Sequence, residues 1–194
     1  MRQIILASSN HGKLTEIQHQ LNGAFDIVLQ KSLGIHDAEE TGLSFVENAI
    51  IKARHAAKIA KKPAIADDSG LVVNALNGEP GIYSARYAGV HGDEKANIKK
   101  LLKELENKKD RRAHFCCIMV YMRNFEDPEP IVCEGRWHGE ILSDEVGSGG
   151  FGYDPVFYLP DLKQTAAQLD LIEKNKMSHR GVALKKLIKQ LQHE

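Results

Sequence analysis

At the centre of the chain lies the stretch Ala64-Ile-Ala-Asp-Asp-Ser-Gly-Leu-Val-Val-Asn-Ala-Leu-Asn-Gly-Glu-Pro-Gly-Ile-Tyr-Ser-Ala-Arg86. Its apolar start, Ala64 to Ala66, predicts a short buried strand that ends at Asp67 and Asp68. Two adjacent carboxylates at a strand end repel each other and lose hydration, so we expect a divalent cation or a proton to compensate them. Ligands also bind at the carboxyl ends of strands in open α/β sheets. The alternative is a solvated turn that Asp67 caps.

The amino-terminal segment predicts a strand, a polar loop and a helix. Gln3 to Ala7 forms the strand, Ser8-Ser-Asn-His-Gly-Lys13 follows, and Leu14, Ile17 and Leu21 recur at helical spacing. Backbone N–H groups at a helix start, with a lysine beside them, make a phosphate cradle. Plain helix capping by the loop explains this segment equally well.

The next segment predicts a second strand, an acidic loop and a long helix. Phe25 to Gln30 is the strand, and Asp37-Ala-Glu-Glu-Thr-Gly42 is the loop. A capping box, Ser44-Phe-Val-Glu47, opens the helix, whose polar residues Asn48, Lys52 and His55 predict a solvated face. The apolar stripe of this helix comprises Ala49, Ile50, Ala53, Ala57 and Ala60.

The acidic loop extends the candidate site at the centre of the chain. Glu39 and Glu40 come shortly before the helix that the capping box opens. They could complete a hard-cation site with Asp67 and Asp68. Such a loop, taken alone, is more often mere surface.

The third quarter of the chain predicts structural elements. Asp93 can cap a helix, and Ala113 to Met122 and Ile131 to Glu140 are β-rich and predict a long hairpin. The cysteines, at positions 116, 117 and 133, lack metal-ligand spacing and indicate buried thiols.

Two segments near the carboxyl terminus combine polar and aromatic residues. Gly147-Ser-Gly-Gly-Phe-Gly-Tyr-Asp-Pro155 is a glycine-rich loop, leading into a strand from Val156 to Leu159, whose aromatics could stack on a base. The alternative is a hairpin turn with Phe151 in the core. Ser178 predicts the cap of a terminal amphipathic helix.

Cations gather at the start of that terminal helix. Lys174, His179 and Arg180 oppose the helix dipole there, an arrangement that is unfavourable unless an anion lies among them. This placement favours a function over random surface charge.

The composition predicts one domain over residues 1–194, without repeats or linkers. Of the 194 residues, 42% are hydrophobic, which is ample for a core. Lys+Arg and Asp+Glu both number 26, so we expect no nucleic-acid partner. No run is long enough for a membrane span or a signal peptide, which predicts a cytoplasmic protein.

These features together predict an α/β protein that binds a magnesium-bound nucleotide. Oxygen ligands for a cation, cationic helix starts and a glycine-aromatic loop supply the three parts of such a site. Whether the nucleotide is hydrolysed or only bound stays open at this point.

The chain resembles the inosine triphosphate pyrophosphatase family, most of all its bacterial members. The resemblance runs nearly end to end through five ordered motifs. The motifs are Ser8-Ser-Asn-His-Gly-Lys13, Glu39-Glu-Thr-Gly42 with Phe45, Glu47, Asn48 and Lys52, Ala66-Asp-Asp-Ser-Gly-Leu71 with Pro80-Gly-Ile-Tyr-Ser-Ala-Arg86, Gly150-Phe-Gly-Tyr-Asp-Pro155, and Ser178-His-Arg-Gly181.

The resemblance implies an activity, a fold and an assembly. It implies Mg²⁺-dependent hydrolysis of ITP, dITP and XTP between the α and β phosphates, which removes non-standard purines from the nucleotide pool. It also implies an elongated mixed β-sheet flanked by helices, two lobes with a substrate cleft between them, and a homodimer.

The resemblance implies roles for individual residues as well. Asp68 would be the catalytic proton acceptor and a metal ligand, and Glu39 the other metal ligand. Supporting roles fall to Asp67, Lys52 and Arg86. The implied substrate-binding residues are Ser8, Ser9, Asn10, His11, Gly12, Lys13, Ser69, Phe151, Gly152, Tyr153, Asp154, Lys174, His179 and Arg180.

Two other functions remain as alternatives. One is a pyrophosphatase acting on pyrimidine nucleoside triphosphates, as in the related septum-inhibitor fold. The other is a module that senses nucleotides without turnover.

Overall fold

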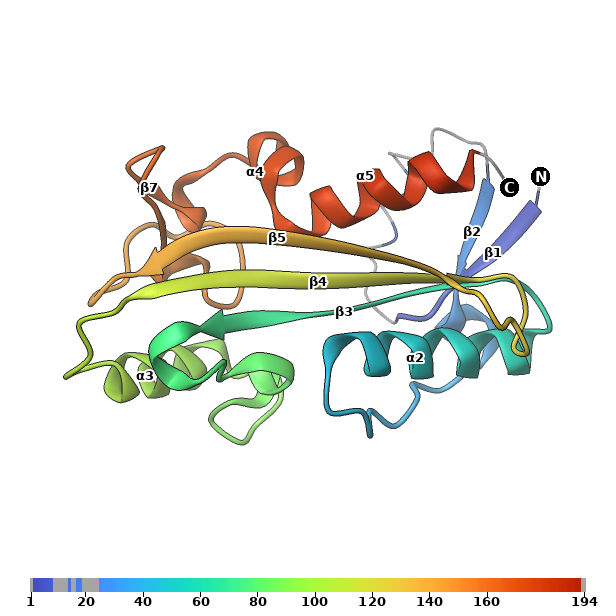
Figure 1. Ribbon diagram of the computed structural model, residues 1–194, viewed down its shortest axis with the longest axis horizontal. Helices are drawn as coiled ribbons and strands as arrows, with labels where there is room; N and C mark the ends of the chain where they lie inside the picture. The colour runs from blue at the N-terminus through green and yellow to red at the C-terminus, as the bar shows by residue number, and fades with distance from the viewer. Residues whose placement is uncertain (1, 9–13, 15–16, 19–24, 193–194) are drawn as a thin grey trace. The chain divides into compact units, whose positions relative to one another are not determined.

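A computed structural model of the chain describes residues 2–8, 14, 17–18 and 25–192. These residues form an α/β structure built on a seven-stranded sheet, with strand order β2-β1-β3-β4-β5-β6-β7 (Figure 1). The strands are β1 (Arg2–Leu6), β2 (Phe25–Leu29), β3 (Ala64–Val73), β4 (Arg112–Met122), β5 (Ile131–Ile141), β6 (Phe157–Leu159) and β7 (Gln164–Thr165). The α-helices are α2 (Phe45–Ala60), α3 (Glu94–Glu104), α4 (Leu171–Met177) and α5 (His179–Leu191). Short 3₁₀ helices are η1 (Gln30–Leu33), η2 (Asn74–Leu76), η3 (Gly81–Arg86), η4 (Asp154–Val156) and η5 (Ala166–Gln168).

The sheet is mixed, which confirms the predicted fold class. Strand β1 pairs in parallel with β2 and with β3, whereas β5 with β6 and β6 with β7 are antiparallel. The predicted hairpin strands, β4 and β5, are neighbours in the sheet. Among the described residues, no helix has both the length and the apolar character that a membrane span requires.

The chain divides into two compact units. The first unit comprises Met1–Asp68, Cys117–Glu134 and Ala183–Glu194, and the second comprises Ser69–Cys116 and Gly135–Val182. The single domain predicted for residues 1–194 and the predicted cleft between lobes stay predictions.

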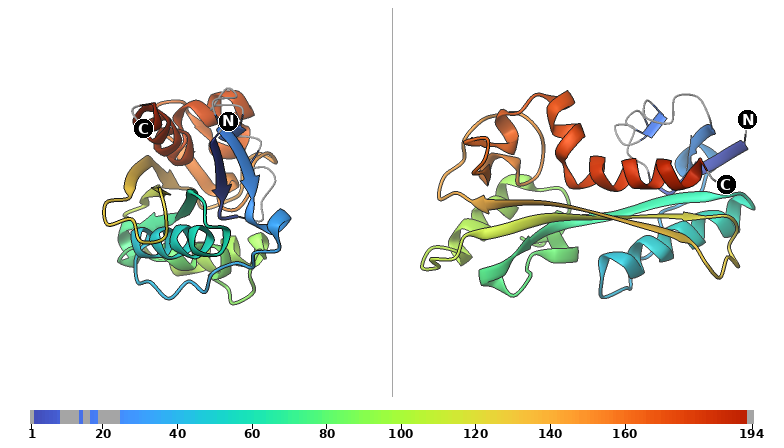
Figure 2. Two further views of the ribbon diagram at one scale, coloured as in Figure 1. Left: turned by 90° about the vertical axis from the view of Figure 1, so that its right-hand side faces the viewer. Right: turned by 45° about the horizontal axis from the view of Figure 1, so that its top comes forward.

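The first unit packs helices on both faces of its strands (Figure 2). Its core joins Ile4, Ile27 and Ile65 of three strands to Leu184 and Leu187 of α5. Helix α2 lies on the other face, where its buried side chains include Ala49, Ala53, Ala56 and Ala57. The predicted capping box opens this helix, because the Glu47 N–H donates to the Ser44 hydroxyl and the Glu47 carboxylate accepts from that hydroxyl at 2.6 Å.

The second unit has a separate core rich in aromatic residues. Phe115, Trp137 and Phe157 contact one another, with ring centroids between 4.5 and 6.4 Å apart. Helix α3 adds Ile98 and Leu101, and it begins at Asp93 as predicted, since the Asp93 carboxylate accepts from the Ala96 N–H. The cysteines at positions 116, 117 and 133 are buried thiols, as predicted.

One strand prediction is wrong. The central strand does not end at Ala66 but continues through both aspartates and Gly70 to Val73. Asp67 and Asp68 are only 4% and 9% exposed, so they lie within a buried strand rather than at its solvated end. Donors on helix α2 make this possible, because they compensate a carboxylate that the sheet removes from water.

Candidate functional site

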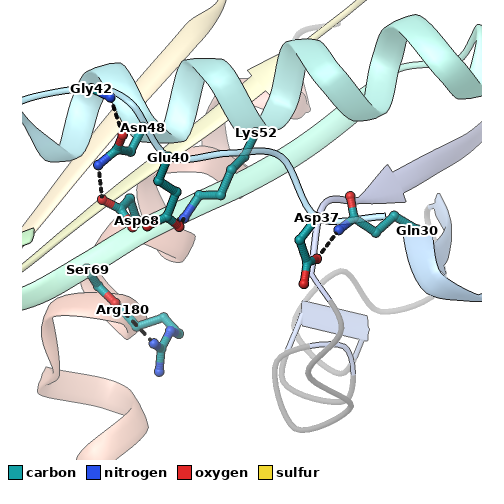
Figure 3. A network of polar contacts seen from close by, with 9 residues as sticks. All are labelled: Gln30, Asp37, Glu40, Gly42, Asn48, Lys52, Asp68, Ser69 and Arg180. Atoms are coloured by element: carbon teal, nitrogen blue, oxygen red, sulfur yellow. Dashed lines mark hydrogen bonds and ion pairs between the residues drawn. The ribbon is translucent and has the colours of Figure 1, made fainter. Parts of the chain in front are cut away.

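The first unit contains a group of charged residues that we call the acid–lysine cluster: Glu40, Lys52, Asp67 and Asp68. The Lys52 ammonium of α2 lies 2.8 Å from Asp68 Oδ1 on β3 and 3.0 Å from Glu40 Oε1 on the acidic loop (Figure 3). Lys52 thus joins a helix, a strand and a loop at one point.

Burial and charge act in opposite directions on this cluster. Burial raises the pKa of Asp68 above its ordinary value, although the Lys52 ammonium opposes that shift. Burial alone would lower the pKa of Lys52, but the charges of Asp68, Asp67 and Glu40 outweigh it, so the pKa is raised. The lysine is therefore held as a cation among carboxylates.

The polar face of α2 is not solvated, contrary to the prediction. Asn48 is fully buried and accepts from the Gly42 N–H at 2.9 Å, while the side chain of Lys52 is 15% exposed. His55 Nε2 lies 3.0 Å from the carbonyl oxygen of His36. This face holds the acidic loop, and the spacing of the three side chains beside an acidic loop is the sequence signal that could have revealed it.

The carboxylates of the acid–lysine cluster have the ligand chemistry that a hard cation prefers. Oxygens of Glu40 and Asp68 converge on one ammonium nitrogen, and carboxylate oxygens are the ligands that Mg²⁺ prefers. Glu39, the predicted ligand, is exposed. In the part of the chain that the structure describes, no group of three or more acidic, histidine or cysteine side chains is arranged to hold a metal, so the set Glu39, Asp67 and Asp68 is not assembled as one.

The second unit contains a contrasting group that we call the aromatic–cation cluster: Phe151, Asp154, Lys174 and Arg180. Asp154 is 2% exposed, and its Oδ2 accepts from the Phe151 N–H at 2.7 Å and from the Lys174 ammonium. Lys174 Nζ lies 4.4 Å from the centroid of the Phe151 ring, and Arg180 Cζ lies 5.7 Å from it. The Phe151 ring is 54% exposed, so the alternative of a ring tucked into the core is excluded.

Other residues predicted for substrate binding also lie in this unit. Tyr153 is 4% exposed and donates its hydroxyl to the Ser84 carbonyl oxygen, and burial raises the pKa of that hydroxyl. The His179 ring stacks on Phe115 with centroids 4.8 Å apart. Ser69 accepts a long hydrogen bond of 3.4 Å from Arg180.

The predicted cation group at the start of the terminal helix needs a correction. Lys174 lies in the last turn of a separate helix, α4, where Asp154 binds it, while His179 and Arg180 begin α5. The predicted cap is confirmed, because the Gly181 N–H donates to the Ser178 hydroxyl at 3.1 Å.

The predicted phosphate cradle falls mostly outside the described residues. Ser9, Asn10, His11, Gly12 and Lys13 lie there, whereas Ser8 is half-buried directly after β1. Arg86, predicted to have a supporting role, places its guanidinium 5.2 Å from the centroid of the Tyr83 ring.

The chain is similar to known proteins along its whole length. The model of the Ham1 family matches residues 4–190. A dITP/XTP pyrophosphatase of Pectobacterium atrosepticum is 54% identical, with all of both chains covered. The solved structure of a HAM1 protein from Coxiella burnetii has a TM-score of 0.97 at 49% identity and covers all of both chains. That of the Staphylococcus aureus Ham1 protein has a TM-score of 0.92 at 44% identity and covers 99% of both.

Proposed function

The chain belongs to the Ham1 family, and we propose on this premise that it hydrolyses non-standard purine nucleoside triphosphates. The substrates are dITP, ITP and XTP, and cleavage between the α and β phosphates yields the nucleoside monophosphate and pyrophosphate. The observation that carries this function is the 54% identity, over the full length of both chains, to a dITP/XTP pyrophosphatase. Such an enzyme keeps these bases out of DNA and RNA.

Asp68 is the proton acceptor in the proposed reaction. Its support is the contact with Lys52, because a neighbouring ammonium favours the ionised carboxylate, which is the form that accepts a proton from water. Asp67 directly precedes Asp68 in an extended strand and so points to the opposite face, which suits a supporting role.

Mg²⁺ is the proposed cofactor, with Glu39 and Asp68 as its carboxylate ligands. When bound, it would place positive charge beside the phosphate oxygens that carry the developing charge. Lys52 and Glu40 hold the adjoining carboxylate and loop in place.

The phosphates and the base have separate proposed binding residues. The loop from Ser8 to Lys13 holds the triphosphate, and the Ser69 hydroxyl contacts the substrate. Phe151 stacks on the base, and buried donors face the 6-oxo group of the purine. The 6-amino group of ATP would leave those donors unpaired, which is a strong basis for discrimination. The proposed base-binding residues are Phe151, Gly152, Tyr153, Asp154, Lys174, His179 and Arg180.

We also propose that the enzyme is a homodimer of the cytoplasm, where the nucleotide pool is. The nucleoside triphosphate is then its small-molecule partner.

A substrate panel tests the proposed function. Pyrophosphate release from dITP, ITP and XTP is compared with release from ATP, GTP, dTTP and UTP, with Mg²⁺ present and after chelation. We expect the first three to be hydrolysed at least about a hundredfold faster than ATP or GTP, in line with discrimination by buried donors. Equal rates would contradict the proposed specificity, and faster hydrolysis of dTTP or UTP would favour the pyrimidine alternative. Full activity after chelation would contradict the proposed requirement for Mg²⁺.

A further inference from the structure

Asn48, in the first turn of α2, uses one side-chain amide to hold two separate parts of the first unit. Its Oδ1 accepts from the Gly42 N–H at 2.9 Å, at the end of the acidic loop. Its Nδ2 donates to Asp68 Oδ2 on β3 at 3.4 Å, a long hydrogen bond (Figure 3). The residue is fully buried, so water does not offer these groups another partner.

The loop approaches the helix so closely at this point that residue 42 has to be glycine. A Cβ at Gly42 would lie 2.7 Å from Asn48 Oδ1 and 2.6 Å from Glu47 Cβ. Two further contacts bind the same loop to the same helix, from Lys52 to Glu40 and from His55 to His36. Asn48 therefore fixes the carboxyl-terminal end of the loop that carries both glutamates.

Asp68 receives one donor on each of its two oxygens. Lys52 binds Oδ1, and Asn48 binds Oδ2, from positions four residues apart on one helix. A carboxylate held by one donor can still rotate about its last side-chain bond, whereas two donors from a rigid helix fix its plane. A residue that holds a reacting carboxylate in its productive orientation supports activity without contacting the substrate. Its loss therefore lowers activity.

We propose that Asn48 is a positioning residue for the reaction. It sets the orientation of the Asp68 carboxylate and ties that carboxylate to the acidic loop. The proposal rests on the proposed function, in which Asp68 accepts the proton.

The second unit provides a matched control for this proposal. Asn97, on α3, is 3% exposed, and its amide accepts from the Ala88 N–H at 2.7 Å and donates to the Ala85 carbonyl oxygen at 3.3 Å. Asn97 therefore also pins a loop to a helix with one buried amide, but its donor reaches a backbone carbonyl instead of a carboxylate.

The experiment compares Asn48→Ala, Asn48→Asp and Asn97→Ala in the full chain. Steady-state release of pyrophosphate from dITP gives kcat and KM, and hydrogen exchange by NMR gives the protection of the Gly42 amide. We expect kcat of Asn48→Ala to fall about 10- to 100-fold with KM within about threefold, and the Gly42 amide to lose protection. Asn97→Ala should keep kcat within about threefold.

Asn48→Asp separates the two contacts. Its carboxylate can still accept from the Gly42 N–H, so that amide should stay protected, but in its ionised form it has no donor for Asp68 and repels it. We therefore expect kcat to fall by at least about tenfold although the loop is held. No variant that lacks a hydrogen-bond donor at position 48 should restore kcat.

Two outcomes overturn the proposal: wild-type kcat in Asn48→Asp, or a loss in Asn48→Ala no larger than that in Asn97→Ala. If Asn48→Ala does not fold, Asn48→Leu replaces it under the same criteria, because leucine has about the shape of asparagine but neither donates nor accepts a hydrogen bond. A wild-type protein that releases no pyrophosphate would refute the proposed function instead, and Gly42 exchange would then decide whether Asn48 holds the loop.

Discussion

Each unit contains a largely buried pair of one lysine and one aspartate, but the surroundings of the two pairs are opposite in charge. In the first unit, the Lys52–Asp68 pair is joined by Glu40 and Asp67, which gives an excess of carboxylates. In the second unit, the Lys174–Asp154 pair lies beside the guanidinium of Arg180 and the ring of Phe151.

The difference teaches that an ion pair takes its chemical role from its neighbours. Surplus carboxylates around the first pair favour a cation and a proton acceptor. Surplus cations and an exposed ring around the second pair favour an electron-rich, flat group such as a purine that carries a carbonyl oxygen. Removing parts of the first cluster should therefore lower kcat, and removing parts of the second should raise KM.

The largest effect is expected for Asp68→Asn. The amide cannot accept a proton from water, so kcat for dITP should fall about a thousandfold, while substrate affinity stays within about tenfold. The measurements are pyrophosphate release and the binding of dITP by calorimetry. Asp127→Asn is the control, because Asp127 is also a buried carboxylate of the first unit but pairs with Arg123. A wild-type protein that binds dITP without any turnover would instead be the nucleotide-sensing module.

The next largest effect is expected when either pair loses its lysine. Lys52→Met and Lys174→Met each leave a buried carboxylate without its cation, so each should lower the free energy of unfolding by about 3 kcal/mol. Urea unfolding near neutral pH measures this loss. A loss below 1 kcal/mol, roughly the value of an exposed ion pair, would mean that the pair is not buried in solution.

The stability deficit of Lys52→Met should depend on pH, which tests the charge balance of the Lys52–Asp68 pair. Burial already raises the pKa of Asp68, and Lys52→Met removes the cation that opposes this shift, so the folded state should hold the proton more tightly than the unfolded state. A raised carboxyl pKa makes stability fall as pH rises, so the deficit of Lys52→Met should shrink as pH falls from about 7 towards 4. A deficit that does not change with pH would contradict this assignment.

Local sequence signals predicted the helix α2 of the first unit but not the polar contacts that join this helix to β3. The Ser44 capping box and the apolar spacing of α2 act within a few residues, and the structure has that helix as predicted. The partners of Asp68 lie 16 and 20 positions away, so no local pattern shows that a strand can continue through two aspartates. At Asp68, tertiary contacts outweigh the low strand propensity of aspartate.

The same limit applies to the second unit. The sequence shows the glycine-rich loop, but such a loop has no helical or strand periodicity. The sequence therefore does not show that Phe151 faces solvent while Tyr153 enters the core. Lys174 belongs to α4 and not to the terminal helix because Asp170 caps α4 as a separate helix, a cap that the prediction lacks. The Asp170 carboxylate accepts from the Glu173 N–H at 2.8 Å. The whole-chain motifs, by contrast, were sufficient to predict the family.

Two glycines of the glycine-rich loop, Gly150 and Gly152, test how the aromatic–cation cluster is held. A Cβ at Gly150 would lie 2.1 Å from Asp154 Oδ2, whereas a Cβ at Gly152 meets nothing within 4 Å, and both residues have positive φ. Gly152→Ala should thus cost only the backbone strain, about 1 kcal/mol, and Gly150→Ala about 3 kcal/mol. Thermal unfolding of both variants measures the difference. Equal costs would show that the Asp154 carboxylate is not fixed against the loop.

The smallest effect is expected for Phe151→Ala, and it completes the contrast between the two clusters. The ring is 54% exposed, so its loss should hardly change stability, but one stacked base is worth about 1–3 kcal/mol. KM for dITP should therefore rise about tenfold with kcat unchanged, while Phe151→Tyr keeps the stacking face and stays near the wild type. Phe125→Ala, which removes a 38% exposed ring of the first unit, controls for the loss of any surface aromatic. A fall in kcat at constant KM would place Phe151 with Asp68 in the reaction itself, and the division of labour between the clusters would then be wrong.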